Sequence, residues 1–521
     1  MIQMLLGDNG IMQGKLLYAK TSLLTRRNII QGAAAVAASS LLPGCNSIIS
    51  SGSSMPPLYS NPQPMPSGPL TLASLSVSST TAGVIGSAFA GLSYEKNSLY
   101  MPRFTASNTN LIALFKRLGT SVLRIGGNSV DENVWTPNGA GQTAGQIAPS
   151  DVASFAAFVK ATGWQCLYGV NLGGAATGAT TPALAAEEVA YAAQQLGSSL
   201  LGIEIGNECD NYGYSGSYYA GNWSLAQFET LWGQFRTAIL ATTPGVAITG
   251  PASADPAHIT TWTIPFGEAV TKSEITLLTQ HYYRADGELP SSTAQYLITP
   301  DTTLTADLPK LQAGAQTIGI PYRISECNSF YDGGSDGVSD SYASSLWVID
   351  FLFNCAQHSS SGVNLHGGGY GAGYTPIADN KGVIVDVRPE YYGILLFTLA
   401  GAGSLLTTQL SAGSLNATAY AVKSASGGLN LVIVNKDLTQ NLQLTAQLPQ
   451  SATWATLLSM NQLSSGATAP NLSATSGVTI QGATVNMDGS FAPASAYTLN
   501  PSGSQLECYV PALSAVLIQI F

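Results

Sequence analysis

Charged side chains are scarce in this 521-residue sequence, and several common chemical signatures are missing. Only 9% of residues are charged, with 19 Lys plus Arg against 29 Asp plus Glu. This balance excludes a nucleic-acid partner, because phosphate binding needs a basic surface. The six cysteines show no CxxC spacing and the four histidines are too scattered for a zinc site, so we expect no metal or cofactor.

Disorder along most of the chain is also excluded, since 45% of residues are hydrophobic. The length predicts one large domain with a smaller one. We expect most of the cysteines other than Cys45 to be buried free thiols. So few surface charges also predict tolerance of acid, because acidification produces little self-repulsion.

The N-terminus lacks an apolar run long enough for a permanent membrane helix, but it contains the elements of an export signal in their usual order. Thr25-Arg-Arg-Asn-Ile-Ile-Gln31 resembles a twin-arginine motif, and Leu42-Pro-Gly-Cys45 resembles a lipobox. We therefore expect a signal at 1–45, a Ser/Pro-rich tether at 46–69 and an exported protein that meets the membrane only through a lipid anchor at Cys45. Removal of residues 1–44 takes the net charge from −10 to −13, because four basic and one acidic residue are lost.

Short apolar runs alternate with helical patterns over residues 83–397. Eight runs occur, at Gly83–Gly91, Ser121–Gly126, Gln165–Val170, Leu200–Ile205, Val246–Gly250, Ile275–Gln280, Pro321–Ser325 and Gly362–Leu365. Three segments between them, Asp151–Ala161, Ala183–Leu196 and Leu225–Leu240, have helical starts or spacing. The pattern predicts an α/β fold, a (β/α)8 barrel. A doubly wound sheet is the alternative, but no glycine-rich phosphate loop follows the first run.

From residue 398 to 521 the pattern changes to strands with period two. Examples are Ala417–Val422, Leu429–Val434, Leu442–Gln447, Ala494–Leu499 and Ala515–Ile520. We predict an all-β sandwich here, joined by a strand at 70–82 from ahead of the barrel.

Two strand ends of the predicted barrel carry glutamates, Glu208 after the fourth run and Glu326 after the seventh. Side chains at the carboxyl ends of barrel strands point into one mouth. Retaining cleavage of a glycosidic bond needs two carboxyls about 5–5.5 Å apart, one protonated and one ionised. Arg124 and a tyrosine of His281-Tyr-Tyr283 are candidate partners for the anion of Glu326, whereas Glu208 has no evident cationic neighbour in sequence. We therefore assign Glu326 as nucleophile and Glu208 as acid/base.

This arrangement resembles clan A of the glycoside hydrolases, in which the acid/base follows an Asn. The closer resemblance is to glycoside hydrolase family 79, the β-glucuronidase and heparanase family, over roughly residue 70 to the end. It implies that Tyr331 and Gly333 bind the carboxylate of a glucuronic acid. A second tyrosine comes from His366-Gly-Gly-Gly-Tyr-Gly-Ala-Gly-Tyr374, where spacing favours Tyr374 over Tyr370.

The resemblance also implies contacts with the sugar hydroxyls. Glu95 and Asn128 match ring-hydroxyl positions, and Asn207 is expected at the 2-hydroxyl. We choose Tyr282 over Tyr283 as the partner of the nucleophile, and expect His281 and His366 to be packed rim residues.

The implied activity is a retaining β-glucuronidase with a glucuronide-containing carbohydrate as substrate. Two departures limit the resemblance to heparanase: Asp332 separates Tyr331 from the glycine pair, and few basic residues are available for a sulfated polymer. The alternatives are another clan A enzyme, such as a xylosidase or glucosidase, and a non-catalytic carbohydrate-binding surface lipoprotein.

Overall fold

The computed structural model describes residues 60–214, 216–270, 274–371 and 373–521. The predicted signal, including Cys45, and residues 46–59 of the predicted tether lie outside this part of the chain. Within it, none of the helices combines the length and apolar character needed to cross a bilayer.

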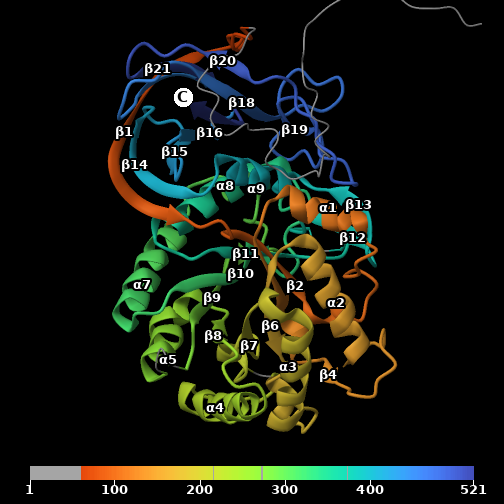
Figure 1. The fold of residues 1–521 in the computed structure, drawn as a ribbon. Coiled ribbons are helices and arrows are strands. Elements are labelled where there is room, and N and C mark those ends of the chain that lie inside the picture. Colours follow the sequence, from red (N-terminus) through yellow and green to blue (C-terminus); the bar gives the residue numbers. More distant parts are fainter. Residues whose placement is uncertain (1–59, 215, 271–273, 372) are drawn as a thin grey trace, which may run out of the picture. The chain divides into compact units, whose positions relative to one another are not determined.

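Eight parallel strands close into the predicted barrel, in the spatial order β10-β11-β2-β3-β6-β7-β8-β9 (Figure 1). They are β2 (Ala90–Glu95), β3 (Val122–Gly126), β6 (Gln165–Val170), β7 (Leu200–Ile205), β8 (Ile248–Ser253), β9 (Leu277–Asp286), β10 (Tyr322–Tyr331) and β11 (Val363–Gly367). The (β/α)8 prediction is thereby confirmed.

Helices follow the strands. They are α1 (Thr109–Arg117), α2 (Pro149–Thr162), α3 (Pro182–Leu196), α4 (Leu225–Thr242), α5 (Ile264–Ala269), α6 (Ala294–Leu297), α7 (Thr302–Ile318), α8 (Tyr342–Gln357) and α9 (Pro389–Ala400). The three predicted helices correspond to α2, α3 and α4. Local chemistry explains the start of α3: Thr181 accepts a hydrogen bond from the Leu184 N–H, and Pro182 fills the first helical position.

The first barrel strand begins later than predicted. Residues 83–85 belong to β1 (Leu70–Ile85), and the barrel starts at Ala90. Ile85 is still paired with Gly403 of the C-terminal domain, so the apolar run that starts at Gly83 is divided between two sheets. Hydropathy alone does not mark such a division, because both parts are short apolar strand segments, even though Val84 in the first part is exposed.

The C-terminal domain is all-β, as predicted. Its strands are β14 (Gly403–Ser411), β15 (Ala417–Ser424), β16 (Leu429–Asn435), β17 (Asn441–Gln447), β18 (Ala455–Gln462), β19 (Val478–Ile480), β20 (Tyr497–Leu499), β21 (Gln505–Val510) and β22 (Ser514–Ile520). The strands form one hydrogen-bonded sheet, because β1 pairs with β14 on one side and with β17 on the other.

The two faces of this sheet have different neighbours. Side chains such as Leu431, Ile433 and Ile518 form a separate core within the domain. On the other face, Tyr420 stacks on Phe353 of α8 with ring centroids 4.2 Å apart. The sheet therefore braces the helix that follows β10, the strand that carries Glu326.

Candidate active site

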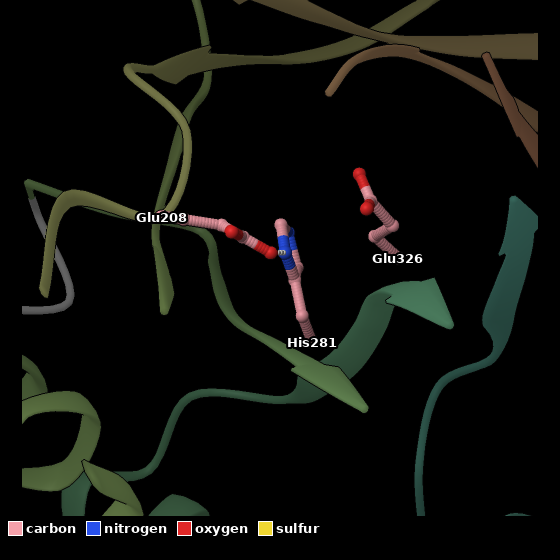
Figure 2. Close-up of side chains that lie close together, drawn as sticks. All are labelled: Glu208, His281 and Glu326. Carbon is pink, nitrogen blue, oxygen red and sulfur yellow. Dashed lines mark hydrogen bonds and ion pairs between the residues drawn. The ribbon is translucent and has the colours of Figure 1, made fainter. Parts of the chain in front are cut away.

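The barrel brings Glu208 and Glu326 together at the carboxyl ends of β7 and β10. Figure 2 shows His281, from β9, beside both residues. A carboxylate oxygen of Glu208, a ring nitrogen of His281 and a carboxylate oxygen of Glu326 all lie within 4.8 Å of one another. This separation suits the retaining pair, at about 5–5.5 Å, better than the wider inverting pair, at roughly 6.5–9.5 Å.

The turn after β7 gives Glu208 its position. Gly206 has φ +83, and an added Cβ would lie 2.5 Å from the Cys209 sulfur, so a larger residue does not fit. Glu208 itself has φ 49, in the left-handed region, and its N–H donates to the Ala252 carbonyl at 2.9 Å. The backbone is thus anchored to β8 while the side chain extends into the mouth.

The Glu326 carboxylate is surrounded by hydrogen-bond donors. Arg124 donates to one oxygen, and Tyr283 donates to the other at 2.8 Å. A ring nitrogen of His366 lies 3.5 Å from the oxygen that Arg124 contacts. Burial raises the pKa of Glu326, but His366, His281, Arg124 and the Tyr283 hydrogen bond outweigh it and hold the pKa well below the usual range. Glu326 is therefore an anion, as a nucleophile requires.

Arg124 joins three parts of the site. Its Nε donates to Glu204 at 2.6 Å, and its Nη2 donates to the Asn207 side chain at 2.8 Å. Burial lowers the pKa of Arg124, but the adjacent carboxylates of Glu204 and Glu326 outweigh this and raise it. Sequence reasoning missed Glu204. The signal was a carboxylate inside an otherwise apolar strand, two residues from Gly202 on the same face.

The pKa of Glu208 is shifted in the opposite direction to that of Glu326. Burial raises its pKa and the charge of Glu326 adds to this, although a hydrogen bond from His281 lowers it in part. The His281 Nδ1 lies 3.0 Å from the Glu208 carboxylate, so the expectation that Glu208 has no cationic neighbour misses a histidine that comes from β9. The net direction favours a proton on Glu208, which is what an acid catalyst needs.

The partner of the nucleophile is Tyr283, and the choice of Tyr282 was wrong. Tyr282 donates to Asp301 at 2.8 Å and packs against Phe351 of α8, on the outer side of the barrel. A register irregularity in β10 between Ile324 and Glu326 shifts its pairing with β9. Alternation along β9 places His281 and Tyr283 on the face that contacts the two glutamates, and it places Tyr282 on the opposite face.

The residues assigned to the ring hydroxyls gather beside Glu326. Asn128 and Glu95 line the same cleft, and Asn207 donates to the Asn128 side chain at 3.3 Å. Glu95 accepts hydrogen bonds from the Asn128 and Ser129 N–H groups and lies 3.5 Å from His366. His281 and His366 are buried, as expected, but both also contact the acidic side chains of the site.

Three tyrosines form a phenol wall on another side. The Tyr283 ring centroid lies 6.5 Å from that of Tyr331 and 6.1 Å from that of Tyr374. Gly333 lines the cleft beside them with φ +83, a conformation that favours glycine. Tyr370 is 66% exposed and does not line the cleft.

A buried network holds the loop that carries Tyr374. The Asn328 side-chain amide donates to the carbonyls of His366 and Tyr374, at 2.9 and 3.0 Å. Glu390 lies behind Asn328, and burial raises its pKa well above the usual range. This support fixes the phenol without placing another charge at the surface of the cleft.

The cleft has a volume of about 830 Å³ and is lined by residues from the ends of most barrel strands. Besides the residues named above, its wall includes Asn211, Tyr214, Ala254, Asp255, Pro256, Ala257, Arg284, Ala285, Thr303, Asp307 and Asp332. Glu208, His281 and Glu326 are close enough to hold a metal ion together. Both oxygens of Glu326 already accept hydrogen bonds from Arg124 and Tyr283, so an ion would have to displace a guanidinium or a phenol.

Comparisons with known proteins support the resemblance. No family model matches the chain. A β-glucuronidase of Aspergillus niger is 24% identical over 302 residues, which is 52% of this chain and 55% of that protein. The chain therefore matches about half the length of this curated relative.

Solved structures share the fold. A 4-O-α-L-rhamnosyl-β-D-glucuronidase from Fusarium oxysporum, in a Rha-GlcA complex, has a TM-score of 0.67 at 19% identity and covers 85% of this chain and 99% of that one. An α-L-arabinofuranosidase from Thermotoga maritima has a TM-score of 0.62 at 14% identity and covers 86% and 100%. The predicted resemblance to a β-glucuronidase is confirmed in sequence over about half of the chain, and the (β/α)8 fold is shared with these glycosidases.

Proposed function

We propose that this protein is a retaining exo-β-glucuronidase, a hydrolase that removes terminal β-linked glucuronic acid. The observation that carries the proposal is the pair of glutamates within 4.8 Å, with the pKa of one raised and that of the other lowered. Opposite shifts on two adjacent carboxyls support Glu208 as the acid and Glu326 as the nucleophile.

The reaction proceeds in two displacements. Glu326 attacks the anomeric carbon while Glu208 gives its proton to the glycosidic oxygen, so that the leaving group departs as an alcohol. The sugar is then an ester of Glu326. Glu208, now ionised, takes a proton from water, and the hydroxide adds to the anomeric carbon and releases the Glu326 carboxylate. Asn207, held by Arg124, is placed to bind the 2-hydroxyl.

The phenol wall supports glucuronate as the glycone. Tyr331, Tyr374 and the Gly333 N–H offer hydrogen-bond donors to a sugar carboxylate, and hydrogen bonds to an ionised acceptor are strong without a formal countercharge. Burial raises the pKa of Tyr374, so its hydroxyl keeps the proton that it would donate. The Aspergillus niger relative adds independent support for this sugar.

Export belongs to the proposal as well. The twin-arginine and lipobox motifs at 1–45 support a location in the periplasm, at the cell surface or outside the cell, with Cys45 as the lipid anchor. Such a location suits an enzyme that meets glucuronide-containing carbohydrates.

The decisive experiment compares wild type with Glu326→Ala on aryl β-glucuronide, β-glucoside and β-xyloside. We expect turnover of the glucuronide alone and its loss in the variant. A cyclophellitol-type glucuronide probe should label Glu326 in the wild type, and this excludes a purely binding lipoprotein. Wild-type turnover in Glu326→Ala would remove the mechanism, and preference for the glucoside or xyloside would favour another clan A activity.

A further inference from the structure

The cleft is larger than a single glucuronic acid requires. A glucuronate has about 13 non-hydrogen atoms, and at roughly 30 Å³ each, the share of a water molecule in the liquid, it fills at most about 400 Å³. The cleft measures about 830 Å³. About half of it is therefore left for the group on the other side of the glycosidic bond.

The remaining wall lies on the Glu208 side. The acid protonates the glycosidic oxygen, so the leaving group must lie next to Glu208 and away from the phenol wall. The loops after β7 and β8 provide this part of the lining, with Asn211 and Tyr214 from one and residues 254–257 from the other.

These two loops are bonded into one unit by Asp210. Its carboxylate accepts the Ala254 N–H at 2.9 Å and the Asp255 N–H at 3.3 Å, and it contacts the His258 ring at 2.8 Å. The wall is thus preorganised, and a ligand bound there loses little free energy to loop ordering.

Tyr214 is the exposed aromatic of this wall. Neighbouring rings in the same loop pack on one another, as Tyr219 does on Trp223 with centroids 4.4 Å apart. Tyr214 is 56% exposed, and it lines the cleft. An open aromatic face beside a glycosidase acid is suited to stack on a ring of the leaving group.

The polar groups of the wall favour a sugar over a plain aromatic ring. Asn211 and Asp255 line it and bring an amide and a carboxyl side chain to this part of the cleft. A sugar hydroxyl can hydrogen-bond with such groups and an unsubstituted aryl group cannot.

The charge of the wall selects against anions. Asp255 lines the cleft, and no cation of the described chain lies within 4.0 Å of its carboxylate. The basic residues of the lining are His366, which contacts Glu95, and Arg284, which lies 3.9 Å from Asp301 and donates to the carbonyls of Leu297 and Thr299. A sulfate or second uronate beside Asp255 would therefore meet a carboxylate that has no ion-pair partner within 4.0 Å among the described residues.

We infer that the wall formed by Asn211, Tyr214 and residues 254–257 is a leaving-group subsite for an uncharged sugar, with Tyr214 as its stacking surface. This inference rests on the proposed function, because it takes Glu208 as the acid. It narrows the substrates to glucuronic acid linked to a neutral sugar.

The test measures kcat/KM of wild type, Tyr214→Ala and Tyr214→Phe on four substrates. These are methyl β-glucuronide, 4-nitrophenyl β-glucuronide, a β-glucuronyl hexose disaccharide and its sulfated form with sulfate on the hexose. The wild-type-to-variant ratio for each substrate cancels differences in intrinsic reactivity. Tyr214→Ala should lower kcat/KM for the neutral disaccharide about three- to tenfold more than for the methyl glucuronide, and Tyr214→Phe should retain most of it.

Two further variants sharpen the result. Asp255→Asn should raise kcat/KM for the sulfated disaccharide relative to the neutral one about two- to fivefold, because a repulsive charge is removed. Tyr509→Ala in β21 is the matched control, since this tyrosine lies outside the lining of the cleft. A thermal melt of each variant identifies any loss that comes from unfolding.

Equal losses on the methyl glucuronide and the disaccharide overturn the inference, as does a loss confined to the 4-nitrophenyl substrate. Failure of the proposed function has a different signature, namely that wild type cleaves no glucuronide at all. In that case the same four leaving groups are attached to the sugar that the wild type does cleave. The wild-type-to-variant ratios of kcat/KM on these substrates then support or overturn the subsite in the same way.

Discussion

Replacing Tyr283 and Tyr282 in turn by Phe tests whether the hydrogen bond from Tyr283 to Glu326 contributes to catalysis. The two residues are adjacent in β9 and the substitution removes only a hydroxyl from each. Tyr283 donates to Glu326 at 2.8 Å, whereas Tyr282 donates to Asp301 on the outer side of the barrel. The pair therefore separates an effect on catalysis from an effect on stability.

The expected loss in Tyr283→Phe follows from one charge-assisted hydrogen bond. Such a bond contributes about 1.5–3 kcal/mol, and about 1.4 kcal/mol changes a rate tenfold. Arg124 still holds the other oxygen of Glu326 in this variant, so we expect a fall in kcat of about 10- to 150-fold. The second displacement should suffer most, because there Glu326 leaves as a carboxylate and its developing charge needs the phenol.

Steady-state and rapid-mixing kinetics on an aryl β-glucuronide check this expectation. The glycosyl-enzyme should accumulate in Tyr283→Phe, so KM falls together with kcat and a burst of the aryl alcohol precedes the steady state. Tyr282→Phe should keep kcat within about twofold of wild type and lose roughly 1–2 kcal/mol of unfolding free energy. A larger fall in kcat in Tyr282→Phe than in Tyr283→Phe would refute the assignment of Tyr283 as the partner of Glu326.

Three other changes give separate tests of the site. Tyr331→Phe should lower kcat/KM for an aryl glucuronide about tenfold and leave any residual aryl glucoside turnover within about twofold, because only the glucuronide has the carboxylate; equal losses would place the sugar carboxylate elsewhere. Arg124→Met should abolish activity and cost about 3–5 kcal/mol of stability by denaturant melt, because Glu204 is left buried and unpaired, and a melt like that of the wild type would contradict this. Burial raises the pKa of Asp131 from 3.8 to about 6 despite its hydrogen bonds. Because the folded-state pKa lies above the unfolded value, the protonated Asp131 stabilises the fold fully below about pH 3.8, and this stabilisation is lost as pH rises through about 6. The unfolding free energy of the wild type relative to Asp131→Asn should therefore increase by up to about 3 kcal/mol when the pH falls from 7 to 4. If this free-energy difference is the same at both pH values, the pKa of Asp131 is not raised in the folded protein.

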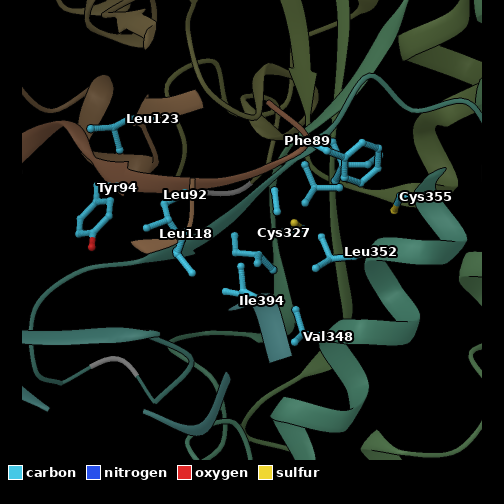
Figure 3. Close-up of a cluster of buried hydrophobic side chains, with 14 of the residues drawn as sticks. Phe89, Leu92, Tyr94, Leu118, Leu123, Cys327, Val348, Leu352, Cys355 and Ile394 are labelled. Atoms are coloured by element: carbon cyan, nitrogen blue, oxygen red, sulfur yellow. The ribbon is translucent and has the colours of Figure 1, made fainter. Parts of the chain in front are cut away.

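The positions of the two glutamates could be predicted because the carboxyl ends of all eight strands of a (β/α)8 barrel lie at the same end of the barrel. Glu208 and Glu326 each follow an apolar run, and the order of the runs places both at the same end. The cysteines were also predictable: all five of the described chain are buried free thiols. Cys327 and Cys355 lie in a packed apolar cluster (Figure 3), where burial raises the pKa of both thiols.

The errors occurred where the result depends on neighbouring strands. The choice between Tyr282 and Tyr283 depends on which face of β9 points into the barrel, and neither tyrosine reveals this by itself. His281 reaches Glu208 from a strand 73 residues away in sequence. The wall at 254–257 is the run Ala-Asp-Pro-Ala, and a single aspartate in a loop gives no chemical signal before the fold places it in the cleft.

The proposed glucuronide substrate requires an acidic protein to hold an acidic sugar at a site whose cations are paired with its own carboxylates. Arg124 is shared between Glu204 and Glu326, and His366 lies between Glu326 and Glu95. In the proposed function the sugar carboxylate faces neutral donors, namely the phenols of Tyr331 and Tyr374, whose raised pKa values keep their protons in place. Hydrogen bonds from such donors depend on direction and distance far more than a field of basic residues does, so the sugar is selected by the position of its carboxylate and not by its charge alone. A net charge of −10 over the full sequence is therefore compatible with the proposed glucuronide substrate.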